Sequence, residues 1–559
     1  MLGSNEYKKY YTNYKAETYT TATSWTAIGN SSKYFKGTFD GQGKTIKNLY
    51  INATTEYQGL FGYSNGGNFK NITLEGTNIT STNQCVGAVL GDGVVTTISN
   101  CKNEGTLSTT KYNIGGIVGR LNNASTIINC ENRGTVTGTG YTSTTYYFGC
   151  VGGIVGNTTY IGATNIENCK NYSTVYGKYR YIGGICGKAT SNNGRINNCI
   201  NEGNVSSDNY YTGGITGQIG WYSNSAKRKE IVLNCINKGT VTSTIASTGG
   251  ISGVIAYGSI VENSQNYGNI SNTGKNSGNN AMCGGIAGQL SVYENNIVKN
   301  CVNRGEVKAQ YNKCGGIVGW AANGNVANCK NEGKIVGSKA HVGGIVGFTG
   351  RYDDSFKTIC VIENCINIGN VEILETGANG HCAGGITGYI YDNSQINYCG
   401  NTGNVTTRGY VNSSNKSSYT GGICGAASTS GNYLIKYCYN TGIVTGGYQG
   451  ISGIIGRLSS STAKIEYCYS TGKVIGNTGV AYIGGIVGHK QAGTVNNSYY
   501  LENTVQDTNG NKQAKETLIG DKKTQAEIKG ITNLNVWKDY FKNDKTPNIN
   551  NGYPILNWQ

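Results

Sequence analysis

The residues best suited to catalysis are Arg351, Asp353 and Asp354, in the segment RYDD. Paired carboxylates beside a basic side chain are used by polysaccharide lyases and glycoside hydrolases to break glycosidic bonds. Other catalytic signatures are absent: the sequence contains no H-E-x-x-H, phosphate loop or dinucleotide fingerprint. We therefore expect a noncatalytic protein without a cofactor, and keep a glycan-cleaving enzyme that uses these three residues as the alternative.

The 19 cysteines are a second chemically active set. Eleven of them recur in one position of a repeat, no C-x-x-C pair occurs, and the three histidines are scattered. Because a free thiol packs as a small apolar side chain, the spacing predicts buried, reduced cysteines and no metal site. Stacked disulfides remain an alternative, and Cys360 with Cys365 is the one pair within a single repeat that would test it.

Aromatic side chains form a third set. Trp320, Phe348 and Tyr389 occupy the same position in three consecutive repeats, which predicts rings stacked in register at one corner. If they are exposed, the same rings would form a platform for carbohydrate. Long segments between repeats hold further aromatic residues beside charged ones. The candidate ligand-binding residues are accordingly Trp221, Tyr222, Trp320, Phe348, Tyr352 and Tyr389.

All these residues are carried by one repeated stretch. GGIVGRLNNASTIINCENRGTVTG, Gly115 to Gly138, returns with small changes about fourteen times between Gly59 and Tyr499, at spacings of roughly 28 to 41 residues. Small or apolar residues fall at every second position, in short runs rich in Ile, Val and Thr, which indicates strands. The 87 glycines would each destabilise a helix by about 1 kcal/mol.

A unit of this size cannot bury its own apolar side, so the copies must stack. We predict an all-β fold, a right-handed parallel β-helix of about fourteen coils with a small C-terminal cap. A β-propeller would need four strands per repeat, for which the shortest spacing is too small. The only prolines are Pro547 and Pro554, both beyond the repeats, as paired strands require.

Two residues after the cysteine position comes an Asn, usually followed by Gly in N-x-G. Stacked Asn side chains can pass amide hydrogen bonds from coil to coil. The same spacing also suits a corner at which Gly takes a positive φ and Asn caps the turn. Both interpretations are structural. The segment G-x-x-D-G-x-G around Asp40 supplies one carboxylate and is expected to be a turn rather than a calcium site.

At this point the sequence resembles a known family. GGIVGRLNNASTIINCENRGTVTG and GGIVGWAANGNVANCKNEGKIVG are similar to GLUG-type repeats of bacterial cell-surface proteins. The opening segment, Trp25 to Tyr63, resembles regions that accompany immunoglobulin-A-cleaving metallopeptidases, and NNGYPILNW, Asn550 to Trp558, resembles their usual end piece. The resemblance implies a secreted or surface-exposed β-helix.

We divide the chain into entry coils at 1–80, the repeat array at 81–500 and a C-terminal capping segment at 501–559. Thr524 and Glu527 have the spacing of a helix capping box. The aromatic residues that follow are expected to cover the open edge of the last coil. The sequence has no stretch of 18 apolar residues, so it predicts no membrane-spanning helix.

A formal charge of +16 favours attraction to anionic polymers, but the sequence has no run of five or more like charges and no nucleic-acid motif, so a nucleic-acid partner is not expected. A solvated basic surface is the simpler interpretation. We expect an extracellular or cell-surface adhesin or stalk that presents loops to a glycan or host protein. The segment before Thr21 lacks the apolar core of a signal peptide, so we expect a missing leader, another export route or a fragment.

Overall fold

The computed structural model divides the chain into two compact units, Met1–Gly268 and Asn269–Gln559. Each unit is a parallel β-helix, as the strand pairings below show. The structure describes residues 23–140, 149–159, 162–223, 226–274, 281–310, 313–338, 341–350, 359–374, 380–391, 393–408, 418–446, 448–476, 480–507, 519–545 and 548–559.

One coil of the first unit illustrates the repeat. Its five short strands are β21 (Ile182–Gly183), β22 (Cys186–Ala189), β23 (Gly194–Asn197), β24 (Ile200–Asn201) and β25 (Val205–Ser207). Each strand pairs in parallel with its equivalent in the next coil, so that Ile182 lies opposite Thr212, Cys186 opposite Thr216 and Val205 opposite Val241. Equivalent residues are therefore in register, as the periodic sequence predicts.

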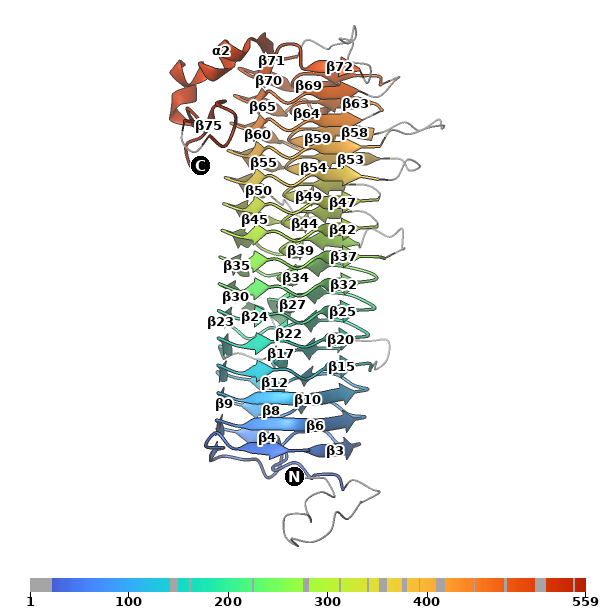
Figure 1. The fold of residues 1–559 in the computed structure, drawn as a ribbon, viewed down its shortest axis with the longest axis vertical. Coiled ribbons are helices and arrows are strands. Elements are labelled where there is room, and N and C mark those ends of the chain that lie inside the picture. Colours follow the sequence, from blue (N-terminus) through green and yellow to red (C-terminus); the bar gives the residue numbers. More distant parts are fainter. Residues whose placement is uncertain are drawn as a thin grey trace. The chain divides into compact units, whose positions relative to one another are not determined.

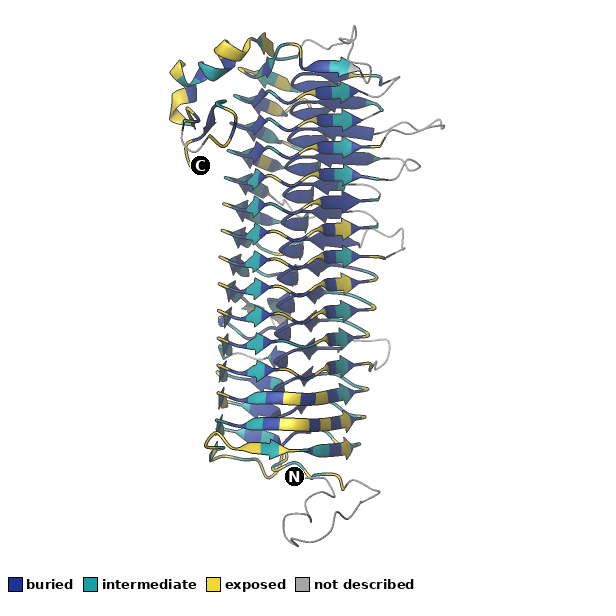
Figure 2. Cartoon of the chain, in the orientation of Figure 1, coloured by how far each residue is buried: buried dark blue, intermediate teal, exposed yellow. Residues whose placement is uncertain are grey.

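The second unit repeats this plan. One of its coils contains β48 (His341–Gly343), β49 (Val346–Thr349), β50 (Cys360–Glu363), β51 (Ile366–Asn367) and β52 (Val371–Ile373). In Figure 1 the strands of each unit are stacked in columns, and in Figure 2 they are mostly buried, with exposed residues concentrated at the bends. The core consists of small aliphatic side chains, of which Ile345, Val346, Ile362, Cys365 and Val371 are fully buried in this coil.

The asparagine column forms a buried ladder, which confirms the first interpretation. In the first unit Asn132 Nδ2 donates 2.9 Å to Asn171 Oδ1, and Asn171 Nδ2 donates 2.8 Å to Asn201 Oδ1. The same amide also donates to the backbone carbonyl two residues later, which for Asn171 is that of Ser173. Because every amide is bonded within and between coils, these polar groups can be buried at little cost.

The second interpretation of N-x-G, a corner at which its Gly takes a positive φ, is not what the repeats show. None of the glycines in N-x-G has a positive φ; instead, the residue before the cysteine position does, with φ between 46° and 55°. Asn and Tyr occupy it at Asn100, Asn129, Asn168, Asn198, Asn234, Asn263, Asn300, Asn328, Asn364, Tyr398, Tyr437, Tyr467 and Asn497. Asn is well suited to such a corner because its short side chain tolerates this conformation.

Glycines of the repeat are needed because neighbouring coils approach closely. A Cβ on Gly184 would lie 2.2 Å from the carbonyl oxygen of Gly214 and 2.3 Å from Cγ of Asn201. In N-x-G, a Cβ on Gly203 would lie 1.9 Å from the carbonyl oxygen of Ser173. The glycine and asparagine columns thus require one another.

All 19 cysteines are free and buried, which confirms the prediction of core thiols. Those of the main column donate to the carbonyl two residues earlier, as Cys199 Sγ does to Asn197 at 3.3 Å. Ser264 takes the same position and makes an equivalent bond to Glu262 at 2.9 Å. Cys360 and Cys365 are both free, so the one candidate disulfide within a repeat is not formed.

The C-terminal segment differs from the prediction. Only β73 (Asp521–Lys523) extends the last coil, by pairing in parallel with β71 (Tyr499–Leu501). The remainder comprises α2 (Gln525–Lys529), η2 (Ile531–Asn533), η3 (Trp537–Asp539), β74 (Phe541–Lys542) and β75 (Ile555–Leu556). It lies beside the strands of the last coils instead of over their open edge (Figure 1). The capping box is confirmed, since Thr524 Oγ1 accepts from Glu527 N and Glu527 Oε2 accepts from Thr524 N.

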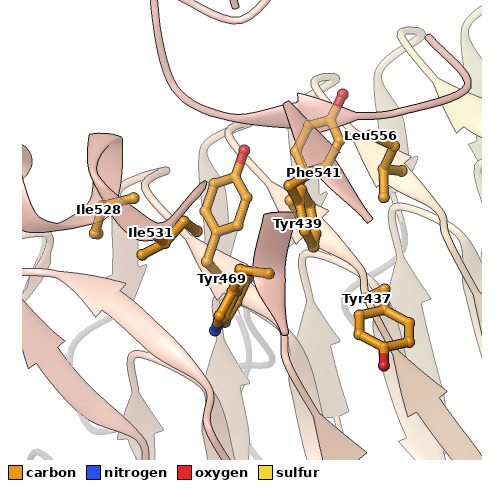
Figure 3. Close-up of a cluster of buried hydrophobic side chains, with 8 residues drawn as sticks. Tyr437, Tyr439, Tyr469, Ile528, Ile531, Phe541 and Leu556 are labelled. Carbon is orange, nitrogen blue, oxygen red and sulfur yellow. The ribbon is translucent and has the colours of Figure 1, made fainter. Parts of the chain in front are cut away.

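The segment packs here because tyrosines replace the asparagine of the corner in these coils. Tyr398 stacks on Tyr437 with ring centroids 5.2 Å apart, and Tyr540 covers Tyr437 at 3.7 Å. Tyr437, Tyr439 and Tyr469 form one apolar cluster with Ile528, Ile531, Trp537, Phe541 and Leu556 (Figure 3). The end of the chain therefore covers the rings at this corner, of which Tyr437 is buried and Tyr398 and Tyr467 are half-buried.

Candidate functional site

The aromatic side chains of the second unit belong to two adjacent columns. The first column contains Lys313, His341, Cys382 and Tyr419 in register, followed by Gly450 and then Tyr482. The second contains Trp320, Phe348, Tyr389, Ala426, Arg457 and His489. We call the two columns together the aromatic–basic face.

A tight turn brings the two columns together. Strand β48 ends at Gly343 and β49 begins at Val346, so the chain reverses over two residues. The backbones then approach so closely that a Cβ on Gly347 would lie 2.7 Å from the backbone nitrogen of Cys314. Since the same G-G-I-V-G sequence recurs in the coils, each coil places the second residue before its glycine pair beside the residue after its glycine block, as with His341 and Phe348.

The part of the face nearest Trp320 is a stack of rings. Phe348 and Tyr389 are parallel within 11°, with centroids 5.5 Å apart, and Trp320 meets Phe348 edge to face at 6.5 Å. His341 lies 4.8 Å from the Tyr389 ring, and Lys313 Nζ lies 4.5 Å from the Trp320 ring centroid. Phe348 is 0% exposed, whereas Trp320 and Tyr389 are half-buried.

The other part of the face is organised around Arg457. Its guanidinium lies 4.6 Å from the Tyr419 ring centroid, and Nη2 donates 3.2 Å to the carbonyl oxygen of Ala427. Nη2 also reaches the hydroxyl of Tyr389 at 3.5 Å, which is possible because the intervening position in the column is the small residue Ala426. His489 is parallel to Tyr482 within 1° at 4.1 Å.

Burial tunes the charges of this face. It lowers the pKa of Lys313 to about 8 and, together with the charges of Lys313, His381 and Arg457, lowers the pKa of His341 to about 3. Burial and the charge of Arg457 also lower the pKa of His489. Burial by itself would lower the pKa of the Arg457 guanidinium. The interactions with Tyr419 and Tyr389 outweigh burial, so the pKa of Arg457 is raised. At neutral pH the face therefore carries cations beside neutral imidazoles.

The equivalent columns of the first unit are more polar. Asp92, which is 0% exposed, accepts from Arg120 Nε at 3.2 Å and from Asn122 Nδ2 at 2.7 Å. Asn157 Nδ2 donates 3.1 Å to Asn113 Oδ1. The buried Asp92 carboxylate is thus satisfied by its neighbours, so it belongs to a structural network.

The predicted site residues fall in separate places. Trp320, Phe348 and Tyr389 are in register on one face, as predicted. Trp221 and Tyr222 lie on β28 (Trp221–Ser223), which pairs with β29 (Ala226–Arg228) in an antiparallel hairpin where we expected a loop. There Lys188 Nζ lies 3.7 Å from the Trp221 ring centroid. Tyr352 and the catalytic candidates Arg351, Asp353 and Asp354 lie outside the described residues.

Sequence reasoning missed the partners of these rings. Arg457 and His489 follow the glycine block in SGIIGR and GGIVGH, at the same position as Trp320, so aligning the repeats on the glycines could have found them. Lys313, His341 and Tyr419 precede the glycine pair, where the sequence varies most. Among the described residues, no group of His, Cys, Asp and Glu could hold a metal ion.

The fold and the repeated face define a parallel β-helix repeat protein. Residues 111–137 and 315–336 match the family described as the GLUG motif, which confirms the resemblance of these repeats. A crystal structure of a "putative immunoglobulin A1 protease" from Bacteroides ovatus is similar, with 17% identity and a TM-score of 0.32 over 65% of this chain and 86% of that chain. No curated protein matches the sequence. No helix in the described part of the chain is long and apolar enough to cross a membrane.

Proposed function

We propose that this chain is a noncatalytic extracellular repeat protein that binds a glycan on the aromatic–basic face of its second unit. The observation that carries this proposal is the run of half-buried and buried rings from Trp320 to Tyr389, bordered by Lys313 and Arg457. Aromatic rings present apolar faces to the C–H groups of a sugar, and a few placed polar groups supply orientation. The GLUG repeats support an extracellular location.

The regular repeat favours a polymer as the ligand. Positions in register recur once per coil along the sheet, so a linear saccharide could meet the two columns of the face at each coil it passes. A protein partner is less well supported. Its interface would need a contiguous apolar centre, whereas the rings of this face alternate with Lys313, His341 and Arg457. An adhesin or stalk role follows from glycan binding at a cell surface.

A glycan array with the purified chain, followed by product analysis on each bound glycan, tests the proposal. We expect binding without new reducing ends or unsaturated sugars. Cleavage of a bound glycan would favour the alternative, a β-helix polysaccharide lyase or glycoside hydrolase. If no saccharide binds, the proposed function is wrong.

A further inference from the structure

Arg457 is a half-buried cation whose partners are all neutral. In the part of the chain that the structure describes, it contacts the hydroxyls of Tyr419 and Tyr389 at 3.4 and 3.5 Å and the carbonyl of Ala427 at 3.2 Å, and no carboxylate. The contrast with the first unit is direct, since Arg120, at the equivalent position of a first-unit coil, is paired with the buried carboxylate of Asp92. A buried guanidinium is normally stabilised by an anion.

Two nitrogen atoms at this end of the face lack a partner. Nε of Arg457 and Nδ1 of His489 are buried and make no hydrogen bond with any described residue. The two residues are neighbours in register on β64 (Ile455–Leu458) and β69 (Val487–Lys490). Their side chains are held in place, Arg457 by the Tyr419 ring and His489 by the parallel Tyr482 ring. Buried polar atoms without partners commonly mark the place of a missing ligand or water.

We propose that Arg457 and His489 bind the acidic group of an anionic saccharide, a carboxylate or a sulfate ester, while its sugar rings lie along the aromatic part of the face. This proposal rests on the proposed function and adds the substrate class. Guanidinium groups match the geometry of carboxylates and sulfates and bind them through charge-assisted hydrogen bonds. The net charge of +16 would add long-range attraction for the same ligands.

The test compares three saccharides of similar length by isothermal titration: an oligogalacturonate, a carrageenan oligosaccharide that carries sulfate esters but no carboxylate, and a neutral cello-oligosaccharide. The wild-type chain should bind at least one acidic saccharide about tenfold or more tightly than the neutral one. Arg457→Gln should reduce that preference to about twofold or less. His489→Phe, which retains a ring for stacking on Tyr482, should reduce the preference by a smaller factor. Comparing the affinities for the two acidic saccharides then shows whether the site prefers a carboxylate or a sulfate ester.

Arg408→Gln is the matched control, because it removes the same charge from an exposed residue of the same unit. It should leave the acidic preference within about twofold of wild type at 0.15 M salt, where distant charges are screened. An unchanged acidic preference in Arg457→Gln, or an equal loss in Arg408→Gln, would overturn the assignment. Binding of neutral and acidic saccharides with equal affinity would also refute it while leaving the proposed function intact. If none of the three saccharides binds and the glycan array is also negative, the proposed function fails and this assignment with it.

Discussion

The side-chain amide of Asn171 donates a 2.8 Å hydrogen bond to Oδ1 of Asn201 in the next coil, and both side chains are fully buried. The ladder that continues through such pairs fixes the register of the coils, because a displaced coil would leave buried amides without partners. The positions of all functional side chains follow from this register.

Asn171→Ala should therefore lower stability strongly. Asn132 and Asn201 would each lose a buried partner, at about 1–3 kcal/mol apiece, so we expect a loss of about 2–6 kcal/mol. Asn168→Ala is the matched control, since Asn168 also donates to an asparagine one coil away but is exposed at the left-handed corner. Its loss should be about 1 kcal/mol. Thermal unfolding followed by circular dichroism compares the two, and equal losses would contradict the ladder's role.

Gly184→Ala tests the close approach of the coils. The added Cβ would meet backbone and the ladder amide at about 2.2–2.3 Å, so the variant should fold poorly or melt far below the wild type. Gly37→Ala provides the comparison, because its Cβ would only meet the Phe35 ring at 3.6 Å. The yield of soluble protein and the melting temperature report the outcome. A normally stable Gly184→Ala protein would show that the coils can separate at this point.

The buried thiols should be unreactive in the folded protein. Since all 19 are free and buried, iodoacetamide should label few cysteines under native conditions and all of them in guanidinium chloride, as counted by mass spectrometry. Cys199→Ser should cost about 1 kcal/mol or less, because Ser264 already shows how a hydroxyl bonds at this position. Rapid native labelling of several cysteines in the main column would contradict the packing.

Glu230 should make stability depend on pH. Burial raises the pKa of this carboxyl from 4.5 to about 8, although Ser191 Oγ donates to it at 2.7 Å. The folded chain then keeps a proton that the unfolded chain releases above pH 4.5, so stability should fall as pH rises from about 5 to about 8, at up to about 1.4 kcal/mol per pH unit. Glu230→Gln should match wild type near pH 5 and be more stable near pH 8. The melting temperatures of both proteins at pH 5 and pH 8 test this. If Glu230 were ionised in the folded state, it would cause no loss of wild-type stability between these pH values.

The strand pattern, register and cysteine core could be predicted because each depends on contacts that recur in every coil. The corner could not be located as well, because Asn fits both a ladder and a left-handed turn, and the structure assigns these roles to different columns, as at Asn171 and Asn168. Contacts made only once were missed. Arg457 reaches Tyr389 because Ala426 is small, and the C-terminal segment packs beside the coils because Tyr437 and Tyr469 offer rings there.

Glycan binding by the Trp320→Ala, Tyr389→Ala double variant tests the proposed binding face most directly. Tyr34→Ala, which removes an aromatic ring that is 42% exposed in the first unit, serves as the control. With all proteins assayed well below their melting temperatures, we expect the double variant to lose at least about tenfold in affinity for a glycan that the wild type binds, and Tyr34→Ala to bind normally. Unchanged affinity in a folded double variant would contradict binding at the aromatic–basic face.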